Sequence, residues 1–249
     1  MKKIPIPENV TAGISVVLLA YKEAENLKFL LPRIKGEVEK LGEPYEILVI
    51  DTAEPLDNTE EICEVSGAVY INQEESEFGG AFRTAIKYAS KRKFLIMDSD
   101  GSHNPKYIPE IYKLFIEGYD IVIGSRYCRG GRNNDAFPSV LMSRTLNFVF
   151  RVCLGEKICD MSTDFRMYDT VQLKAVELRN KNYDVLQEVL LKMRLNNPAL
   201  KIGETPIVFE KRLAGISKRR LIPFIIKYLK SLVVLTAISL AAKFRKRKK

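Results

Sequence analysis

The sequence FLIMDSDGSHNP, from Phe94 to Pro105, places an apolar run, two carboxylates and a helix start side by side. Four apolar residues lead directly into two aspartates separated by one serine, and a glycine and an Asn-Pro pair follow. The apolar run has the length of a buried strand, and Asn-Pro often starts a helix. Two carboxylates at the end of such a strand fit a metal site for a nucleotide-linked substrate, a phosphoryl-transfer aspartate or turn chemistry.

Similar apolar runs alternate with helical patterns before and after this stretch. We expect strands at residues 14–21, 45–51, 68–72, 94–98 and 121–124, and helices at 24–41, 58–65, 80–92 and 105–117. Alternation of this kind predicts an α/β fold with a mostly parallel sheet and right-handed crossovers. Ligands of such sheets bind beyond the carboxyl ends of the strands. The side chains expected at that edge are Tyr21, Lys22, Glu23, Asp51, Asp98, Asp100 and Arg126.

The second half of the chain is less regular. It predicts helices at 138–154 and near 183–195, and a strand at 201–211, while the segment 159–169 has no assigned element. The loop at 128–138, CRGGRNNDAFP, is rich in Gly and Asn. Such a loop beside a ligand edge is expected to be a mobile lid.

Composition excludes several classes of site and protein. The chain has 249 residues and is 46% hydrophobic, enough for one main globular domain with an appendage. Its four cysteines form no CxxC pair and there is one histidine, so no zinc cluster is expected and the thiols are expected to be reduced. The start, MKKIPIPENV, contains two prolines and no apolar core of a secretory signal.

The positive charge is confined to one end of the chain. Residues 211–249 carry 13 Lys and Arg and no acid, which leaves 27 basic against 31 acidic residues in the rest. A nucleic-acid binder usually spreads basic residues over a face of its fold, so no nucleic-acid partner is expected. Here KRR at 218–220 and KFRKRKK at 243–249 flank an apolar segment at 221–242. This arrangement favours an anionic membrane surface.

Six segments, in order, resemble family 2 glycosyltransferases of the nucleotide-diphospho-sugar transferase (GT-A, Rossmann-like) fold. Among these, the chain most resembles the polyprenyl-phosphate (dolichyl-phosphate) mannose synthases. The segments are LLAYKEAENL (18–27), MDSDGSHNPKYIPE (97–110), YDIVIGSRY (119–127), MSRTLNF (142–148), DMSTDFRMY (160–168) and FEKRLAGISK (209–218). The resemblance implies transfer of a mannose-like or glucose-like sugar from a nucleotide-diphospho-sugar to a polyprenyl phosphate, with inversion.

The resemblance also implies roles for individual residues. Asp98 and Asp100 would bind Mg²⁺ or Mn²⁺, and together with Arg126 they would be the catalytic residues. The acceptor lipid phosphate would be bound by Ser143 and Arg144. The donor nucleotide-sugar would be bound by Tyr21, Glu23, Asp51, Asp98, Arg212 and Lys218.

A phosphate acceptor does not require a strong general base from the protein. Its second pKa is near ~6, so it arrives ionised and needs no strong general base. The sequence shows no obvious His–carboxylate pair, in agreement with such an acceptor. A sugar hydroxyl acceptor would instead need a carboxylate base, for which Glu188 and Asp160 are candidates.

Other interpretations stay open at the level of sequence. DSDGS also matches the nucleophile loop of haloacid-dehalogenase-type phosphohydrolases, although that family places it on the first strand. The loop DTAEPLDNT at 51–59 departs from the family pattern. This departure leaves the nucleotide base of the donor in doubt and allows a membrane-tethered, sugar-nucleotide-binding pseudoenzyme.

Arg166 could form an ion pair with an acid such as Asp164 or belong to the site. For His103, packing or hydrogen bonding is favoured over a role as a base.

We expect a catalytic domain at 1–217 and a basic, apolar, membrane-associating tail at 218–249. Pro223, Lys227 and Lys230 interrupt the apolar segment, and its clean part, residues 231–242, would span only about 18 Å as a helix. Crossing a bilayer would also place KFRKRKK on the side opposite the catalytic domain. The tail is therefore expected to lie in the cytoplasmic leaflet as a peripheral or monotopic anchor.

Overall fold

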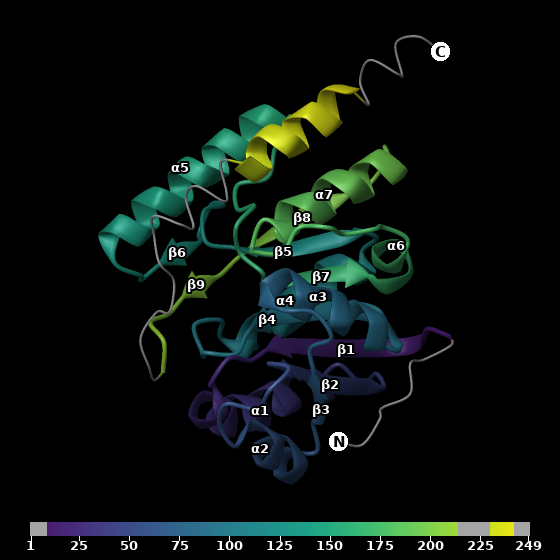
Figure 1. Cartoon of the computed structure of the whole chain (residues 1–249), viewed down its shortest axis with the longest axis vertical. Coiled ribbons are helices and arrows are strands. Elements are labelled where there is room, and N and C mark those ends of the chain that lie inside the picture. Colours follow the sequence, from purple (N-terminus) through teal and green to yellow (C-terminus); the bar gives the residue numbers. More distant parts are fainter. Residues whose placement is uncertain (1–8, 214–229, 242–249) are drawn as a thin grey trace.

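The computed structural model of the chain describes residues 9–213 and 230–241. A seven-stranded sheet in the order β3-β2-β1-β4-β7-β5-β8 lies at its centre, and a separate two-stranded pair, β6-β9, lies beside it (Figure 1). The strands are β1 (Thr11–Leu19), β2 (Tyr45–Asp51), β3 (Val69–Asn72), β4 (Lys91–Asp98), β5 (Ile121–Ser125), β6 (Arg132–Asn133), β7 (Arg166–Asp169), β8 (Ile202–Pro206) and β9 (Val208–Phe209).

Helices cover both faces of this sheet. They are α1 (Ala24–Glu39), α2 (Thr59–Ser66), α3 (Glu77–Tyr88), the 3₁₀ turn η1 (Pro105–Tyr107), α4 (Ile108–Ile116), α5 (Phe137–Leu154), α6 (Thr170–Lys174) and α7 (Val185–Asn196). On one face α1, α2 and α4 pack against the strands, and on the other α3, α5, α6 and α7 do so.

The sheet is mostly parallel, as the alternating pattern predicts. β1 pairs in parallel with β2 and β4, and β5 pairs in parallel with β8. The exception is β7, which lies antiparallel between β4 and β5 and was not expected. Its four residues, RMYD, begin and end with charged side chains, so they do not show the apolar run by which the other strands are recognised.

Alternate residues of each strand supply the two halves of the core. In β1, Val17 belongs to the cluster under α3 and α5, whereas Val16 and Leu18 belong to the cluster under α1 and α4. Strands buried on both faces must be apolar throughout, which is why these runs show no alternation with polar residues. The expected fold class is confirmed.

Several predicted boundaries were wrong. The helix expected at 80–92 begins at Glu77 and ends at Tyr88, and β4 already begins at Lys91. The charged start of β4, KRK, continues a helical pattern in the sequence but pairs with β1 and β7 in the structure. The strand expected at 201–211 is divided into β8 and β9, which belong to different sheets.

Part of the tail packs on the domain. Residues 230–241 form a helix, drawn in yellow beside α5 and α7 in Figure 1. Leu235 of this helix is buried in the same apolar cluster as the inner faces of α5 and α7, and Ser231 Oγ accepts a hydrogen bond of 3.0 Å from Asn180 Nδ2. Within the described ranges no helix is long and apolar enough to cross a membrane. The remainder of the predicted 221–242 segment lies outside these ranges.

We predict that Gly79→Ala lowers the free energy of unfolding by about 1–3 kcal/mol. A Cβ at this position of α3 would lie 2.1 Å from the backbone oxygen of Asn180, so one of the two chains must move. The matched control is Gly36→Ala in α1, where a Cβ meets nothing within 4 Å. The control should raise the free energy of unfolding by up to about 1 kcal/mol, because alanine is a better helix former than glycine. Denaturant unfolding measures both changes, and equal effects would contradict this packing.

Candidate active site

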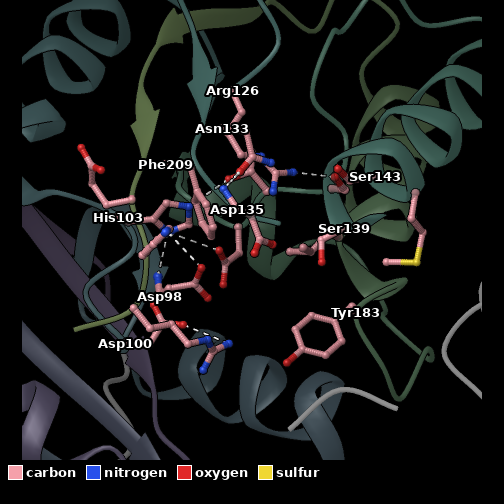
Figure 2. A pocket seen from close by; sticks show the side chains of 18 of the residues that line it. Asp98, Asp100, His103, Arg126, Asn133, Asp135, Ser139, Ser143, Tyr183 and Phe209 are labelled. Atoms are coloured by element: carbon pink, nitrogen blue, oxygen red, sulfur yellow. Dashed lines mark hydrogen bonds and ion pairs between the residues drawn. The ribbon is translucent and has the colours of Figure 1, made fainter. Parts of the chain in front are cut away.

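A cavity of about 340 Å³ opens at the carboxyl ends of β4 and β5. Figure 2 shows Asp98, Asp100 and His103 on one side of it and Ser139, Ser143 and Tyr183 on the other. The first group follows β4, and the second belongs to α5 and to the loop before α7. Arg126, Lys211 and Arg212 also line the cavity, together with Asp135, Asp164 and Glu210. The predicted edge of the sheet therefore does contain a polar pocket.

The loop at residues 98–103 is held in a tight turn. Ser102 donates its backbone N–H to Asp100 Oδ1 at 2.9 Å, and its hydroxyl lies 2.5 Å from the same oxygen. Gly101 has a φ of +80° and faces Leu213, whose Cδ1 would lie 2.5 Å from any added Cβ. Glycine is needed here both for the left-handed backbone and for the close approach.

The end of the described domain pairs with this loop. Phe209 forms an antiparallel bridge with His103, and Glu210 and Leu213 donate backbone N–H groups to the carbonyls of Ser102 and Asp100. The two N···O distances are 2.9 and 3.1 Å. This pairing brings residues more than a hundred positions apart in the sequence onto one wall of the cavity.

Arg212 is placed by this pairing next to a predicted metal ligand. Its Nη2 lies 3.0 Å from Asp100 Oδ2. Because the other carboxylate oxygen of Asp100 is taken by Ser102, both oxygens have partners within the protein. Lys218, the other basic residue predicted from the same segment, lies outside the described residues.

His103 is buried between two aromatic rings, with centroids 5.0 Å from Phe165 and 5.1 Å from Phe209. Its Nδ1 accepts the backbone N–H of Asp98 at 3.0 Å, so the proton of the neutral ring is on Nε2, which faces Thr163 Oγ1. Burial lowers the pKa of His103 in spite of the nearby carboxylates. The favoured interpretation as a packing and hydrogen-bonding residue is confirmed.

The structure also brings together a His–carboxylate cluster that the sequence did not reveal. Asp98 Oδ2 and Asp164 Oδ1 lie 3.4 and 3.6 Å from His103 Nδ1, and one potential ligand atom of each residue lies within 4.8 Å of those of the other two. The antiparallel register of β4 and β7 pairs Ile96 with Arg166, and two further steps set Asp98 opposite Asp164. The sequence showed no obvious His–carboxylate pair, because the strand that brings Asp164 to this position, β7, was not recognised.

Arg126 is joined to Asp160 by two short hydrogen bonds. Nε lies 2.7 Å from Oδ2 and Nη2 lies 2.8 Å from Oδ1, while the backbone N–H of Arg126 also reaches Oδ2 at 3.0 Å. Burial opposes the charge of Asp160, but Arg126 and the hydrogen bonds outweigh it and lower the pKa of Asp160 to about 2. The pair fixes the wall of the cavity, and the geometry makes Arg126 a positioning residue.

The predicted acceptor residues lie on α5, on the opposite wall. Ser143 lines the cavity and its hydroxyl is hydrogen-bonded to the hydroxyl of Tyr127. Arg144 is exposed, and its guanidinium lies over the ring of Tyr127, with Cζ 5.2 Å from the centroid. Asn133 of the predicted lid loop donates to the same tyrosine hydroxyl at 2.9 Å. The structure thus gathers the predicted acceptor residues around Tyr127, which the sequence analysis did not single out.

The predicted donor residues lie further along the sheet edge. Asp51 is fully buried, with Oδ1 accepting from the N–H of Thr52 at 2.8 Å and Oδ2 accepting from the hydroxyl of Tyr70 at 3.0 Å. Burial raises the pKa of Asp51 in spite of these bonds. Glu23 accepts from Asn26 at 2.6 Å at the start of α1, and Tyr21 is half exposed beside it. A role of these residues in nucleotide binding stays a prediction.

Two further residues have structural partners. The guanidinium of Arg166 is fully buried and donates to the backbone oxygens of Met161 and Leu186 at 2.8 and 3.0 Å, rather than to Asp164. Glu188 forms an ion pair with Lys192 at 2.7 Å and accepts backbone N–H groups of the loop before α7. Glu188 does not line the cavity, so it is poorly placed as a base.

The residues present fit a divalent cation. Mg²⁺ and Mn²⁺ prefer carboxylate oxygens, and Asp98, Asp100 and Asp164 supply them at one edge of the cavity. Among the described lining residues, acids outnumber bases, although a diphosphate would bring further negative charge. Asp98 and Asp100 were predicted as the ligands, and Asp164 is a further carboxylate that lines the same cavity.

Comparison with known proteins is consistent with this site. Residues 15–176 match the family described as Glycosyl transferase family 2. A dolichol-phosphate mannosyltransferase of Pyrococcus furiosus is 32% identical over 212 residues, covering 82% of this chain and 58% of that protein. A polyprenol monophosphomannose synthase of Mycolicibacterium smegmatis is 30% identical over 228 residues, covering 86% of this chain and 83% of that protein. The chain therefore spans less than two thirds of the Pyrococcus relative.

Solved structures show the same fold. Glucosyl-3-phosphoglycerate synthase from Mycobacterium tuberculosis, in complex with Mn²⁺ and UDP-glucose, superposes with a TM-score of 0.72 at 18% identity, covering 91% of this chain and 79% of that one. Its complex with Mg²⁺ and UDP gives the same score and identity. The expected GT-A fold is confirmed. The phosphohydrolase interpretation of DSDGS is not supported, because both the family match and the fold are those of glycosyltransferases.

We predict that Arg126→Ala and Asp160→Ala each lower the free energy of unfolding at pH 7 by about 3–5 kcal/mol, because each leaves a buried charge without its partner. The double variant should lower the free energy of unfolding by clearly less than the sum of the two single-variant effects. Arg132→Ala, which removes an exposed arginine from β6, is the control and should change the free energy of unfolding by less than about 0.5 kcal/mol. Additive single effects would show that the pair is not coupled.

Proposed function

The chain belongs to glycosyl transferase family 2, and we propose that it is a metal-dependent hexosyltransferase that moves a sugar from a nucleotide-diphospho-sugar to a polyprenyl phosphate with inversion. The names of the Pyrococcus and Mycolicibacterium relatives, which are polyprenyl-phosphate mannosyltransferases, support this acceptor class. The sugar would be mannose-like or glucose-like, carried on GDP or UDP.

The observation that carries the proposal is the double role of α5. One side of this helix lines the cavity through Ser139 and Ser143. Another side exposes large apolar residues at helical spacing, Leu141, Phe148 and Val152, which are 55%, 59% and 63% exposed. An acceptor with a phosphate head and a long apolar chain needs both kinds of surface side by side.

On the acceptor wall, Ser143 and Arg144 would bind the lipid phosphate. Arg144 presents an exposed guanidinium, and a guanidinium pairs well with phosphate oxygens. An ionised phosphate oxygen can attack the sugar without losing a proton, so the chain needs only to hold it in line with the departing diphosphate. The two carboxylates considered as a base for a hydroxyl acceptor are poorly suited to that role. Asp160 has a pKa of about 2, and Glu188 lies outside the cavity lining.

On the donor wall, the acids at the end of β4 and the basic residues of 209–213 would bind the diphosphate. A divalent cation held there would neutralise the charge that develops on the leaving diphosphate. Arg212 is within reach of the same region through its contact with Asp100. Tyr21, Glu23 and Asp51, together with Lys218, would complete the nucleotide site, and Arg126 keeps the wall between donor and acceptor in place.

We further propose that the protein is peripheral or monotopic on the cytoplasmic side of an anionic membrane, with a catalytic domain at 1–217 and an anchoring tail at 218–249. The apolar side of α5 and the exposed Val233, Val234 and Leu240 of the tail helix would face the lipid. The 13 basic residues of 211–249 would add attraction to anionic headgroups. This orientation would bring the cavity to the depth of the lipid phosphate.

The function is tested by incubating the protein with labelled GDP- and UDP-sugars, Mg²⁺ or Mn²⁺, and either polyprenyl phosphate or the corresponding polyprenol. Label should enter the lipid phase with polyprenyl phosphate alone, and EDTA should abolish the transfer. Transfer to the polyprenol alone would favour a hydroxyl acceptor. Binding of a sugar nucleotide without transfer to either lipid would identify a pseudoenzyme.

We predict that Arg144→Ala raises the apparent KM for the lipid phosphate about 10-fold or more, as expected for a lost charged hydrogen bond, and changes the KM for the donor less. Arg212→Ala should raise the KM for the donor more than the KM for the lipid phosphate. Arg151→Ala removes the same charge from the same helix, but Arg151 stacks on Phe148 instead of Tyr127, and its loss should leave both KM values within twofold. Equal effects of Arg144→Ala on both substrates would argue against separate walls.

We predict that Phe148→Asp weakens binding to anionic vesicles about 10-fold or more, because it removes an apolar side chain worth about 2 kcal/mol on burial and adds a negative charge. Val65→Asp is the matched control, since Val65 is 84% exposed but lies on α2, on the other face of the sheet. The control should change vesicle flotation less than twofold. Equal losses for both variants would contradict a membrane surface centred on α5.

A further inference from the structure

We propose that Asp164 is a direct ligand of the divalent cation, opposite Asp98. The proposal rests on the function above for the presence of the cation, and it adds a residue that the sequence pattern did not indicate. Asp164 belongs to the segment before β7, which the antiparallel register places against the end of β4.

The geometry suits a shared cation. A carboxylate oxygen of Asp98 and one of Asp164 lie within 4.8 Å of each other, and both residues line the cavity. Oxygens on opposite sides of Mg²⁺ are about 4.2 Å apart, given metal–oxygen distances of about 2.1 Å. A small movement of either side chain therefore lets one ion contact both carboxylates.

The imidazole ring between these carboxylates is already engaged. Figure 2 shows His103 with dashed contacts to both sides of the cluster. Its Nδ1 lone pair accepts the backbone N–H of Asp98 at 3.0 Å. A ring nitrogen whose lone pair is engaged in this way is not available to ligate an ion.

The guanidinium groups that line the cavity are committed to other acids. Arg126 is paired with Asp160, and Arg212 is paired with Asp100. In the described structure Asp100 also accepts two hydrogen bonds from Ser102 on its remaining oxygen. Asp98 and Asp164 both line the cavity, and a bound cation would attract both carboxylates.

The test measures Mn²⁺ binding directly, from the electron paramagnetic resonance signal of free Mn²⁺, with the full chain and with GDP or UDP present. Asp164→Asn keeps the size of the side chain but removes its charge, and it should weaken Mn²⁺ binding at least 10-fold. The matched control is Asp135→Asn, which neutralises another acid lining the same cavity outside the cluster and should change binding less than twofold. Unchanged Mn²⁺ affinity in Asp164→Asn would overturn the proposal.

A second variant separates ligation from a general electrostatic effect. In Asp164→Cys a thiolate replaces the carboxylate, and thiolates prefer Cd²⁺ to Mn²⁺. Relative to wild type, this variant should bind Cd²⁺ more tightly and Mn²⁺ more weakly, a reversal that a merely structural role would not produce. Thermal unfolding in EDTA serves as the fold control for both variants, and a loss of Mn²⁺ binding without the Cd²⁺ gain would overturn direct ligation.

The outcomes distinguish this proposal from the proposed function. A wild-type protein that binds Mn²⁺ through Asp164 but transfers no sugar would refute the function and leave the cation site standing. A protein that transfers sugar while Asp164→Asn binds Mn²⁺ normally would refute the cation site alone. A wild type that binds no Mn²⁺ with either nucleotide would overturn the inference.

Discussion

The pairing of residues 209–213 with the loop at 98–103 is the contact on which the rest of the site depends. It joins the last described part of the domain to the end of β4 through the Phe209–His103 bridge and backbone hydrogen bonds. It also places Phe209 on the ring of His103 and Arg212 on Asp100. Since His103 in turn accepts the N–H of Asp98, one short segment fixes both aspartates of the loop.

The cavity combines two walls with different tasks. The wall formed by β4 and 209–213 gathers acids and suits a cation with a diphosphate, whereas α5 presents hydroxyls inward and apolar side chains outward. Under the proposed function, such a division would let a single pocket accept one substrate from water and another from a membrane. The tail helix at 230–241 packs through Leu235 into the same apolar cluster as the buried face of α5.

Sequence patterns predicted the parallel strands and the carboxylate loop because buried strands are apolar along their whole length and the loop follows one of them directly. Asp164 escaped this reasoning, since its position depends on β7, a four-residue strand with charged ends. The Arg126–Asp160 pair escaped it too: an arginine near a ligand edge suggests anion binding, and only the fold shows that a buried carboxylate already occupies it. A register search for an antiparallel partner of β4 could have found Asp164.

In the proposed mechanism, transfer to the lipid phosphate is a single in-line displacement by an oxygen that needs no base, with Asp98, Asp100 and Asp164 on the leaving-group side. The stereochemistry of the product tests this most directly. Purified lipid product made from an α-linked nucleotide-sugar can be assigned from the one-bond carbon–hydrogen coupling at the anomeric carbon. The expected product is a β-linked sugar phosphate. An α-linked product would contradict the proposed mechanism, because retention requires either a covalent intermediate or a different approach of the acceptor.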